Sequence, residues 1–152
     1  MKILFVCTGN TCRSPMAAKI LQEKLKRYKI KDVEVDSAGL AVYVPTKMNE
    51  YAEIALKNLK VPAGSHKSKQ VDYELIKSAD YVITMTEAHK LAMGGGSNIF
   101  SARDLLGEDI GDPYGKSLDD YKLCAVMLDK LDVAVITKLI LERKKENAKK
   151  DS

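Results

Sequence analysis

Residues 7–14, CTGNTCRS, combine residue types that can bind a phosphate group and attack it. A loop that turns into the start of a helix directs several backbone N–H groups toward one point, and the helix dipole adds positive potential there. Such a field favours a thiolate at Cys7, the nucleophilic form of a cysteine. Arg13 can fold back and offer paired N–H donors to phosphate oxygens. These features predict a phosphoryl-transfer site.

Two further features support a phosphate-binding loop rather than a buried cysteine followed by a surface arginine. Gly9 and Asn10 tolerate the positive φ angles that inward-pointing amides need. Ser14 and Pro15 are typical of the N-cap and first position of a helix. The expected loop comprises Thr8, Gly9, Asn10, Thr11, Cys12, Arg13 and Ser14, directly after the candidate nucleophile Cys7.

Phosphoryl transfer also needs a proton donor for the leaving group and a base for the attacking water. Asp112 is the candidate, since Pro113 restricts its backbone to extended conformations. Tyr114 could form an aromatic wall for the substrate. The alternative is an ordinary Asp-Pro turn.

The other polar residues carry less chemistry. His66 and His89 have no partner at metal-ligand spacing, so we expect structural roles, no metal and no cofactor. Cys124 lies on an apolar helical stripe and is expected in the core.

Alternating strands and helices position the loop. Strands are expected at 3–6, 33–39, 81–83 and 99–100, and helices after Pro15, at 48–59, at 73–76 and at 118–144. Residues 101–117 are expected to form a long surface loop. This order predicts a single three-layer α/β domain over residues 1–152, with a parallel sheet between helices and a charged, fraying tail at 142–152.

Composition excludes several classes of protein. The 152 residues carry 25 basic and 21 acidic side chains, a net charge of +4, and the tail with five basic and three acidic residues supplies half of it. No charged face for nucleic acid is therefore indicated. Three cysteines argue against a disulfide framework, and no apolar run is long enough to span a membrane. We expect a cytoplasmic monomer without nucleic-acid or membrane partners.

Several segments resemble the low-molecular-weight protein phosphatase family: VCTGNTCRSPMAA near the start, DSAGL at 36–40, SHKSKQ at 65–70, SADYVITMT at 78–86 and DPYG at 112–115. The resemblance covers residues 2 to about 143. It implies a four-stranded parallel sheet, no metal, and phosphorylated protein substrates.

The resemblance also implies roles for residues. Cys7 would attack phosphorus to form a thiophosphate, Arg13 would hold the transferring group, and Asp112 would protonate the leaving atom and then activate water. Ser14 would bond the Cys7 sulfur. The resemblance further makes Asn10 a strained residue supported by Ser37 and His66.

Two residues bear on the substrate. Tyrosine-directed members usually hold a branched aliphatic residue at the position of Thr11 and two aromatics after the Asp-Pro, whereas here Tyr114 precedes Gly115. Both features resemble the bacterial protein-arginine-phosphatase branch. A hydroxyl in the pocket wall suits a guanidinium-linked phosphate better than an aliphatic wall does. Phosphoarginine is therefore favoured, and phosphotyrosine is the alternative because Tyr114 is the aromatic that tyrosine-directed members carry.

Two other functions use the same features. Arsenate reduction on this fold needs two further cysteines around residues 75–95, and that segment has none. A redox-sensing oxyanion-binding module is the remaining alternative, because a disulfide between Cys7 and Cys12 would reversibly block the nucleophile.

Overall fold

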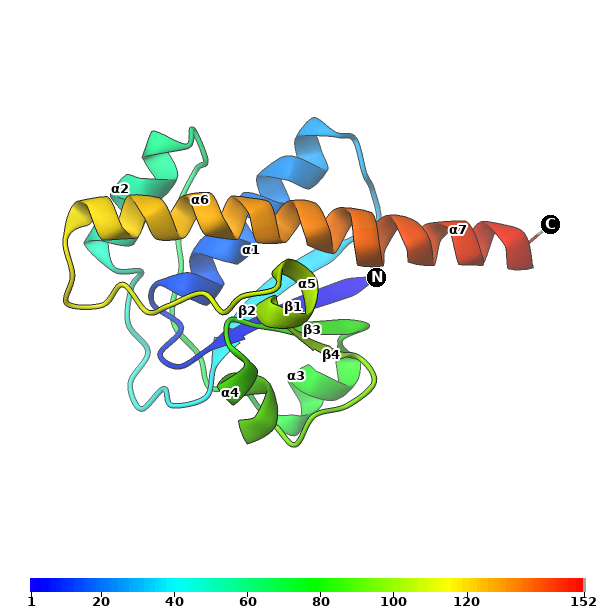
Figure 1. The fold of residues 1–152 in the computed structure, drawn as a ribbon, viewed down its shortest axis with the longest axis horizontal. Helices are drawn as coiled ribbons and strands as arrows, with labels where there is room; N and C mark the ends of the chain where they lie inside the picture. The colour runs from blue at the N-terminus through cyan, green and yellow to red at the C-terminus, as the bar shows by residue number, and fades with distance from the viewer. Residues whose placement is uncertain (152) are drawn as a thin grey trace.

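A computed structural model describes residues 1–151 and shows a central sheet between two layers of helices (Figure 1). The elements follow one another as β1 (Lys2–Cys7), α1 (Arg13–Arg27), β2 (Glu34–Gly39), α2 (Glu50–Asn58), α3 (Tyr73–Ser78), β3 (Tyr81–Thr84), α4 (Glu87–Ala92), β4 (Ile99–Ser101), α5 (Ala102–Leu106), α6 (Leu118–Val135), the π-helical turn η1 (Ile136–Ile140) and α7 (Leu141–Lys150).

The four strands form one parallel sheet in the order β2-β1-β3-β4, which confirms the expected α/β architecture. β1 is buried on both faces because its run of apolar residues lies between helices on either side. Ile3 and Phe5 face the larger core, whereas Leu4 and Val6 face the smaller one.

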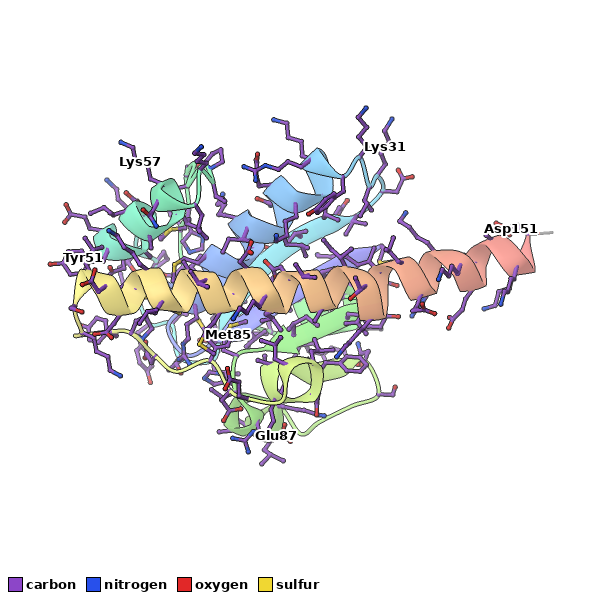
Figure 2. All side chains as sticks on the ribbon, turned by 45° about the horizontal axis from the view of Figure 1, so that its top comes forward. Lys31, Tyr51, Lys57, Met85, Glu87 and Asp151 are labelled. Atoms are coloured by element: carbon purple, nitrogen blue, oxygen red, sulfur yellow. The ribbon has the colours of Figure 1, made fainter. Side chains whose placement is uncertain are left out.

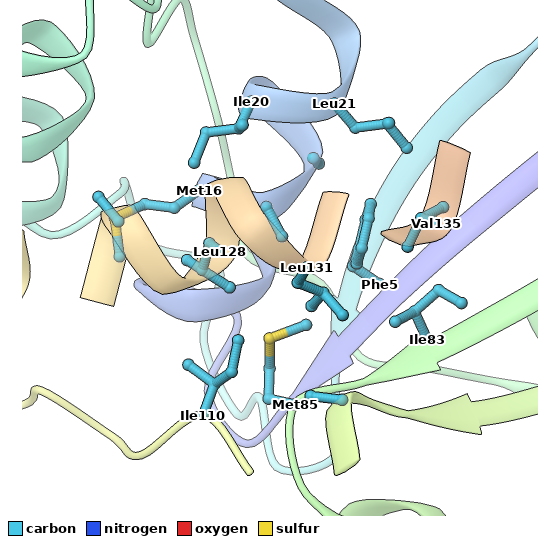
Figure 3. Packing of buried hydrophobic residues seen from close by; sticks show 14 of the residues in the cluster. Phe5, Met16, Ile20, Leu21, Ile83, Met85, Ile110, Leu128, Leu131 and Val135 are labelled. Atoms are coloured by element: carbon cyan, nitrogen blue, oxygen red, sulfur yellow. The ribbon is translucent and has the colours of Figure 1, made fainter. Parts of the chain in front are cut away.

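The larger core lies between the sheet and α1, α2, α5 and α6. Phe5 and Ile83 from the strands pack there with Met16 of α1 and with Leu128 and Leu131 of α6 (Figure 3). The smaller core, on the opposite face, includes Val82 and the half-buried side chains of α3. The helices on the two faces therefore hold β1 at the centre of the domain.

The long C-terminal helix of the sequence analysis is present, with a wider π turn at η1 inside it. Its last part, α7, extends past the sheet (Figure 1 and Figure 2). Arg143 and Lys144 in its first turn contact Tyr81 and the Lys31 carbonyl, whereas residues 145–150 are exposed. None of the side chains of α7 is buried, as expected for the charged tail. Ser152, the last residue of that tail, lies outside the described residues.

Two expectations about local structure were wrong, and one helix was missed. Helix α1 begins at Arg13 with Cys12 as its N-cap, so Ser14 lies within the first turn and does not cap the helix. The segment 101–117 is not one loop, because Ser101 and Asp104 form a capping box that starts α5. The short helix α4, which Thr86 caps, was not predicted.

Asp132 on α6 is a fully buried carboxyl group whose two oxygens have no hydrogen-bond partner among residues 1–151. Burial raises its pKa well above the ordinary value, Lys24 opposes that shift, and Asp129 adds to it. The folded protein thus holds a proton that the unfolded chain releases at a lower pH. Stability from this group is present below the ordinary pKa of Asp and is lost as the pH rises toward the raised value.

We expect Asp132→Asn to raise the free energy of unfolding at neutral pH by about 1–3 kcal/mol, because the amide keeps the shape of the protonated acid and cannot ionise. Below about pH 3.5 the ordinary protonation of Asp should make the gain small. Urea unfolding of both proteins at the two pH values tests this. An equal gain at both would contradict the assignment of the effect to ionisation.

Candidate active site

The loop of residues 8–12 joins the end of β1 to the start of α1. The connection that leaves the carboxyl end of β1 leads to β2, and the one that leaves β3 leads to β4, on opposite sides of the β1–β3 pair. Such a switch point opens a crevice where open α/β sheets bind ligands.

Backbone hydrogen bonds turn the carbonyl groups of this loop outward. Those of Cys7 and Thr8 accept from the amides of Leu40 and Ala41, at 2.9 and 3.0 Å. The carbonyl of Thr11 accepts from the Asn49 amide at 2.9 Å. Within residues 1–151, the N–H groups of 8–12 have no partner that competes for them. These amides are therefore available to an anion in the loop.

Asn10 holds the shape of the loop from inside the protein. Its φ is +56°, in the left-handed region, and its side chain is fully buried. The side-chain amide donates to the hydroxyls of Ser14 and Ser37 at 2.8 and 3.0 Å, and its oxygen accepts from the Lys69 amide at 3.0 Å. His66 Nε2 donates to the Asn10 carbonyl at 2.8 Å. These bonds offset the cost of the strained backbone.

The same network reaches the thiol of Cys7. Because Asn10 donates to the Ser14 hydroxyl oxygen, the hydroxyl hydrogen is left for a nearby acceptor. Cys7 Sγ lies 2.9 Å from that oxygen, closer than the Ala38 carbonyl at 3.4 Å. A donated hydrogen bond of this kind stabilises a negative charge on sulfur.

Gly39, at the end of β2, lets the strand pack directly against the loop. A Cβ at this position would lie 2.6 Å from the Thr8 carbonyl oxygen and 3.1 Å from Asn10 Cβ. A larger residue there would have to displace the loop.

A cavity of about 200 Å³ opens over the loop, and Cys7 and Arg13 both line it. The guanidinium of Arg13 is almost fully buried and donates to the Ile110 carbonyl at 2.9 Å. It lies 3.6 Å from the Asp112 carboxylate, whose side chain is 51% exposed. Tyr114, 73% exposed, forms part of the rim. The structure thus brings the three candidate reactive groups and the candidate wall residues Thr11 and Tyr114 to one cavity.

One contact to the loop was missed by the sequence analysis. His89 Nε2 lies 2.9 Å from Thr8 Oγ1, although 81 residues separate them. His66, for which a structural role was expected, lies against the Asn10 carbonyl. Nothing in the sequence around His89 distinguishes it from a core histidine, because the contact depends on where β3 lies beside β1.

The remaining cysteines have different surroundings. Burial raises the pKa of the Cys12 thiol, and its sulfur lies 3.6 Å from the Tyr121 hydroxyl. Cys124 is buried in the larger core, as expected, and burial raises its pKa to about 12. Among residues 1–151 no three His, Cys, Asp or Glu side chains are grouped so as to hold a metal ion.

Comparison with known proteins finds phosphatases, both by family model and by sequence similarity. A family model described as low molecular weight phosphotyrosine protein phosphatase matches residues 2–148. The protein-arginine-phosphatase of Geobacillus stearothermophilus is 34% identical over 150 residues, covering 93% of this chain and 98% of that protein. The low molecular weight protein-tyrosine-phosphatase PtpB of Staphylococcus haemolyticus is 35% identical over 130 residues, covering 80% of this chain and 88% of that protein.

Solved structures show the same fold. A mutant of the YwlE arginine phosphatase, described as carrying a phosphorylated active-site serine, superposes with a TM-score of 0.85 at 35% identity, covering 95% of this chain and 99% of that one.

Proposed function

The chain belongs to the low molecular weight phosphotyrosine protein phosphatase family, and on this premise we propose that it hydrolyses phosphoarginine in proteins, with Cys7 as nucleophile, Arg13 as phosphate ligand and Asp112 as acid and base. It is a cysteine-dependent phosphatase that acts on phosphorylated proteins. The residue roles and the preference for arginine are our inference.

The proposed reaction has two displacements at phosphorus. The Cys7 thiolate attacks, a P–S bond forms, and the P–N bond to the guanidinium breaks while Asp112 gives its proton to the leaving nitrogen. Water then attacks the thiophosphate, Asp112 takes its proton, and phosphate leaves as the P–S bond breaks. Arg13 and the free loop amides balance the negative charge in both steps.

The position of these groups supports the proposed roles. Ser14 lies 2.9 Å from the sulfur, where its hydrogen bond can stabilise the thiolate both before attack and as leaving group. Arg13 and Asp112 lie 3.6 Å apart in the wall of the same cavity, so both side chains can reach a phosphoryl group held there. Asn10, with Ser37 and His66, is proposed to hold the loop.

The preference for phosphoarginine rests on one observation, the hydroxyl side chain of Thr11 in the wall of the cavity. A hydroxyl can bond the polar guanidinium, whereas an aliphatic side chain favours an aromatic ring. The relatives named protein-arginine-phosphatase support this choice. Phosphotyrosine is the second candidate, because Tyr114 offers an aromatic wall at the rim.

Thr11→Ile is expected to shift the ratio of kcat/KM for a phosphoarginine peptide over a phosphotyrosine peptide toward phosphotyrosine by about tenfold or more. The lost hydroxyl removes a polar partner and the added carbons favour a ring. Thr11→Ser, which keeps the hydroxyl, is the matched control and should keep the ratio close to that of the unmodified protein. No shift in Thr11→Ile would remove Thr11 as the selector.

We also infer a cytoplasmic monomer, with Cys12 as a redox partner that protects Cys7 by a disulfide. All three cysteines are free, which suits a reducing compartment. Within residues 1–151, none of the helices combines the length and hydropathy of a membrane-spanning segment.

A further inference from the structure

We propose that His89 is a positioning residue which fixes the hydroxyl group of Thr8 in the wall of the cavity, and that this pair favours a substrate with a polar leaving group over one with an aromatic ring. The proposal rests on the proposed function, whose substrate class it deepens. It concerns a second wall residue, independent of Thr11.

The contact joins two segments that meet at the switch point of the sheet. Thr8 follows β1 and lines the cavity, and His89 belongs to α4, the helix after β3. His89 as a whole is only 8% exposed, and its Nε2 lies 2.9 Å from Thr8 Oγ1. Thr8 itself is exposed. A buried ring therefore reaches an exposed hydroxyl from behind.

Helix α4 is held firmly enough to fix the ring. The Thr86 hydroxyl accepts from the His89 amide at 3.1 Å. The Glu87 amide donates to Asp109 at 2.9 Å, and the Glu87 carboxylate accepts from the Ser101 hydroxyl at 2.7 Å. Lys90 pairs with Asp104 at 2.8 Å. The helix is thus tied to the end of β4 and to the segment that follows it.

The surroundings of the ring determine which nitrogen carries the hydrogen. Nδ1 is buried and has no hydrogen-bond partner among residues 1–151. A buried N–H without a partner is rarer in proteins than a buried acceptor without one. The hydrogen of the neutral ring is therefore assigned to Nε2, which donates to Thr8 Oγ1.

The charged groups around His89 are consistent with a neutral ring. Burial lowers its pKa to about 4, and Arg13, at the start of α1, acts in the same direction. Asp109 and Asp112, from the segment after α5, oppose the shift. The ring is neutral at physiological pH, so the direction of its hydrogen bond to Thr8 does not change there.

This direction determines what Thr8 offers to a ligand. Since Nε2 donates to the Thr8 oxygen, the hydroxyl hydrogen of Thr8 is free, and its oxygen retains a lone pair. Thr8 can then bond a phosphoryl oxygen or a guanidinium N–H in the cavity. With Thr11 on the same cavity, two hydroxyls rather than one face the leaving group. An aromatic ring would leave the free hydroxyl hydrogen of Thr8 without an acceptor, at a cost in binding.

The test measures kcat/KM for phosphoarginine and phosphotyrosine peptides of the same sequence with Thr8→Val, His89→Leu, His89→Gln and the double variant Thr8→Val/His89→Leu. Thr8→Val and His89→Leu should each lower the phosphoarginine-to-phosphotyrosine ratio about threefold to tenfold. The double variant should show no more than the larger single effect, because His89 acts through Thr8. His89→Gln should recover most of the ratio, since its amide can donate to Thr8.

The outcomes separate this proposal from the function on which it rests. An unchanged ratio in His89→Leu, or single effects that multiply in the double variant, would overturn the role of His89 while leaving phosphoarginine hydrolysis intact. A loss of thermal stability alone would mean a structural histidine. If the unmodified protein does not hydrolyse the phosphoarginine peptide, the proposed function fails first, and this inference with it.

Discussion

Replacement of Cys7 by serine is expected to lower the turnover of an aryl phosphate by about 10⁴-fold or more. The two side chains have nearly the same shape, so the cavity and the bond to Ser14 should persist. A serine hydroxyl, however, is far less acidic than a thiol, and the amides and Arg13 cannot hold it as an anion at neutral pH. Steady-state rates at a saturating concentration of aryl phosphate measure the effect.

Cys124→Ala is the matched control for this variant. Cys124 lies in the larger core and does not line the cavity. Its replacement should lower stability while the protein that remains folded keeps its turnover. Retained turnover in Cys7→Ser, or an equal loss in Cys124→Ala, would contradict the assignment of Cys7 as nucleophile.

Asp112→Asn is expected to lower kcat by about 10²–10⁴-fold on a phosphoarginine peptide. In the unmodified protein the backbone N–H of Tyr114 donates to the Asp112 carboxylate at 3.1 Å. The side-chain oxygen of asparagine can accept the same hydrogen bond, so the turn should be retained. It cannot protonate a leaving nitrogen or take a proton from water. With an aryl phosphate, whose leaving group needs little help, the first displacement should be much less affected than the second.

The control for Asp112→Asn is Glu108→Gln, which removes one negative charge from the same segment. Glu108 is exposed and does not line the cavity. The turnover of Glu108→Gln should stay close to that of the unmodified protein. A loss of similar size in both variants would assign the effect to the net charge near the site rather than to proton transfer.

The parts of the fold with a strong local signal could be predicted from the sequence. The continuous apolar run of β1 predicts a strand that is buried on both faces. The apolar residues of 118–140 recur at helical spacing, which predicts a helix with one apolar face. The loop after β1 could be recognised locally, because Cys7, Gly9 and Arg13 lie close together in the sequence. Asp112 was a candidate because the reaction needs a carboxyl group and Pro113 restrains its backbone, and the structure places it in the wall of the same cavity.

What could not be predicted depends on contacts between distant segments. From the residues alone Ser14 was expected to cap a helix, and only the resemblance placed it beside the Cys7 sulfur. The hydrogen bond that it accepts from Asn10 was not predicted, because it depends on how the loop folds. His89 touches Thr8 only because β3 pairs with β1. The unpaired carboxyl of Asp132 falls on the apolar face of α6, where the helical pattern alone predicts an apolar residue.

The central claim is that phosphate passes through a covalent bond to Cys7, and a trapping measurement tests it most directly. Asp112→Asn is mixed with an aryl phosphate, quenched with denaturant at alkaline pH within the first turnover, digested, and analysed by mass spectrometry. Because the second displacement is slowed, the peptide that contains Cys7 should carry the added mass of one phosphoryl group on sulfur. Release of the aryl alcohol without a phosphoryl group on Cys7, or with one on another residue, would contradict the claim.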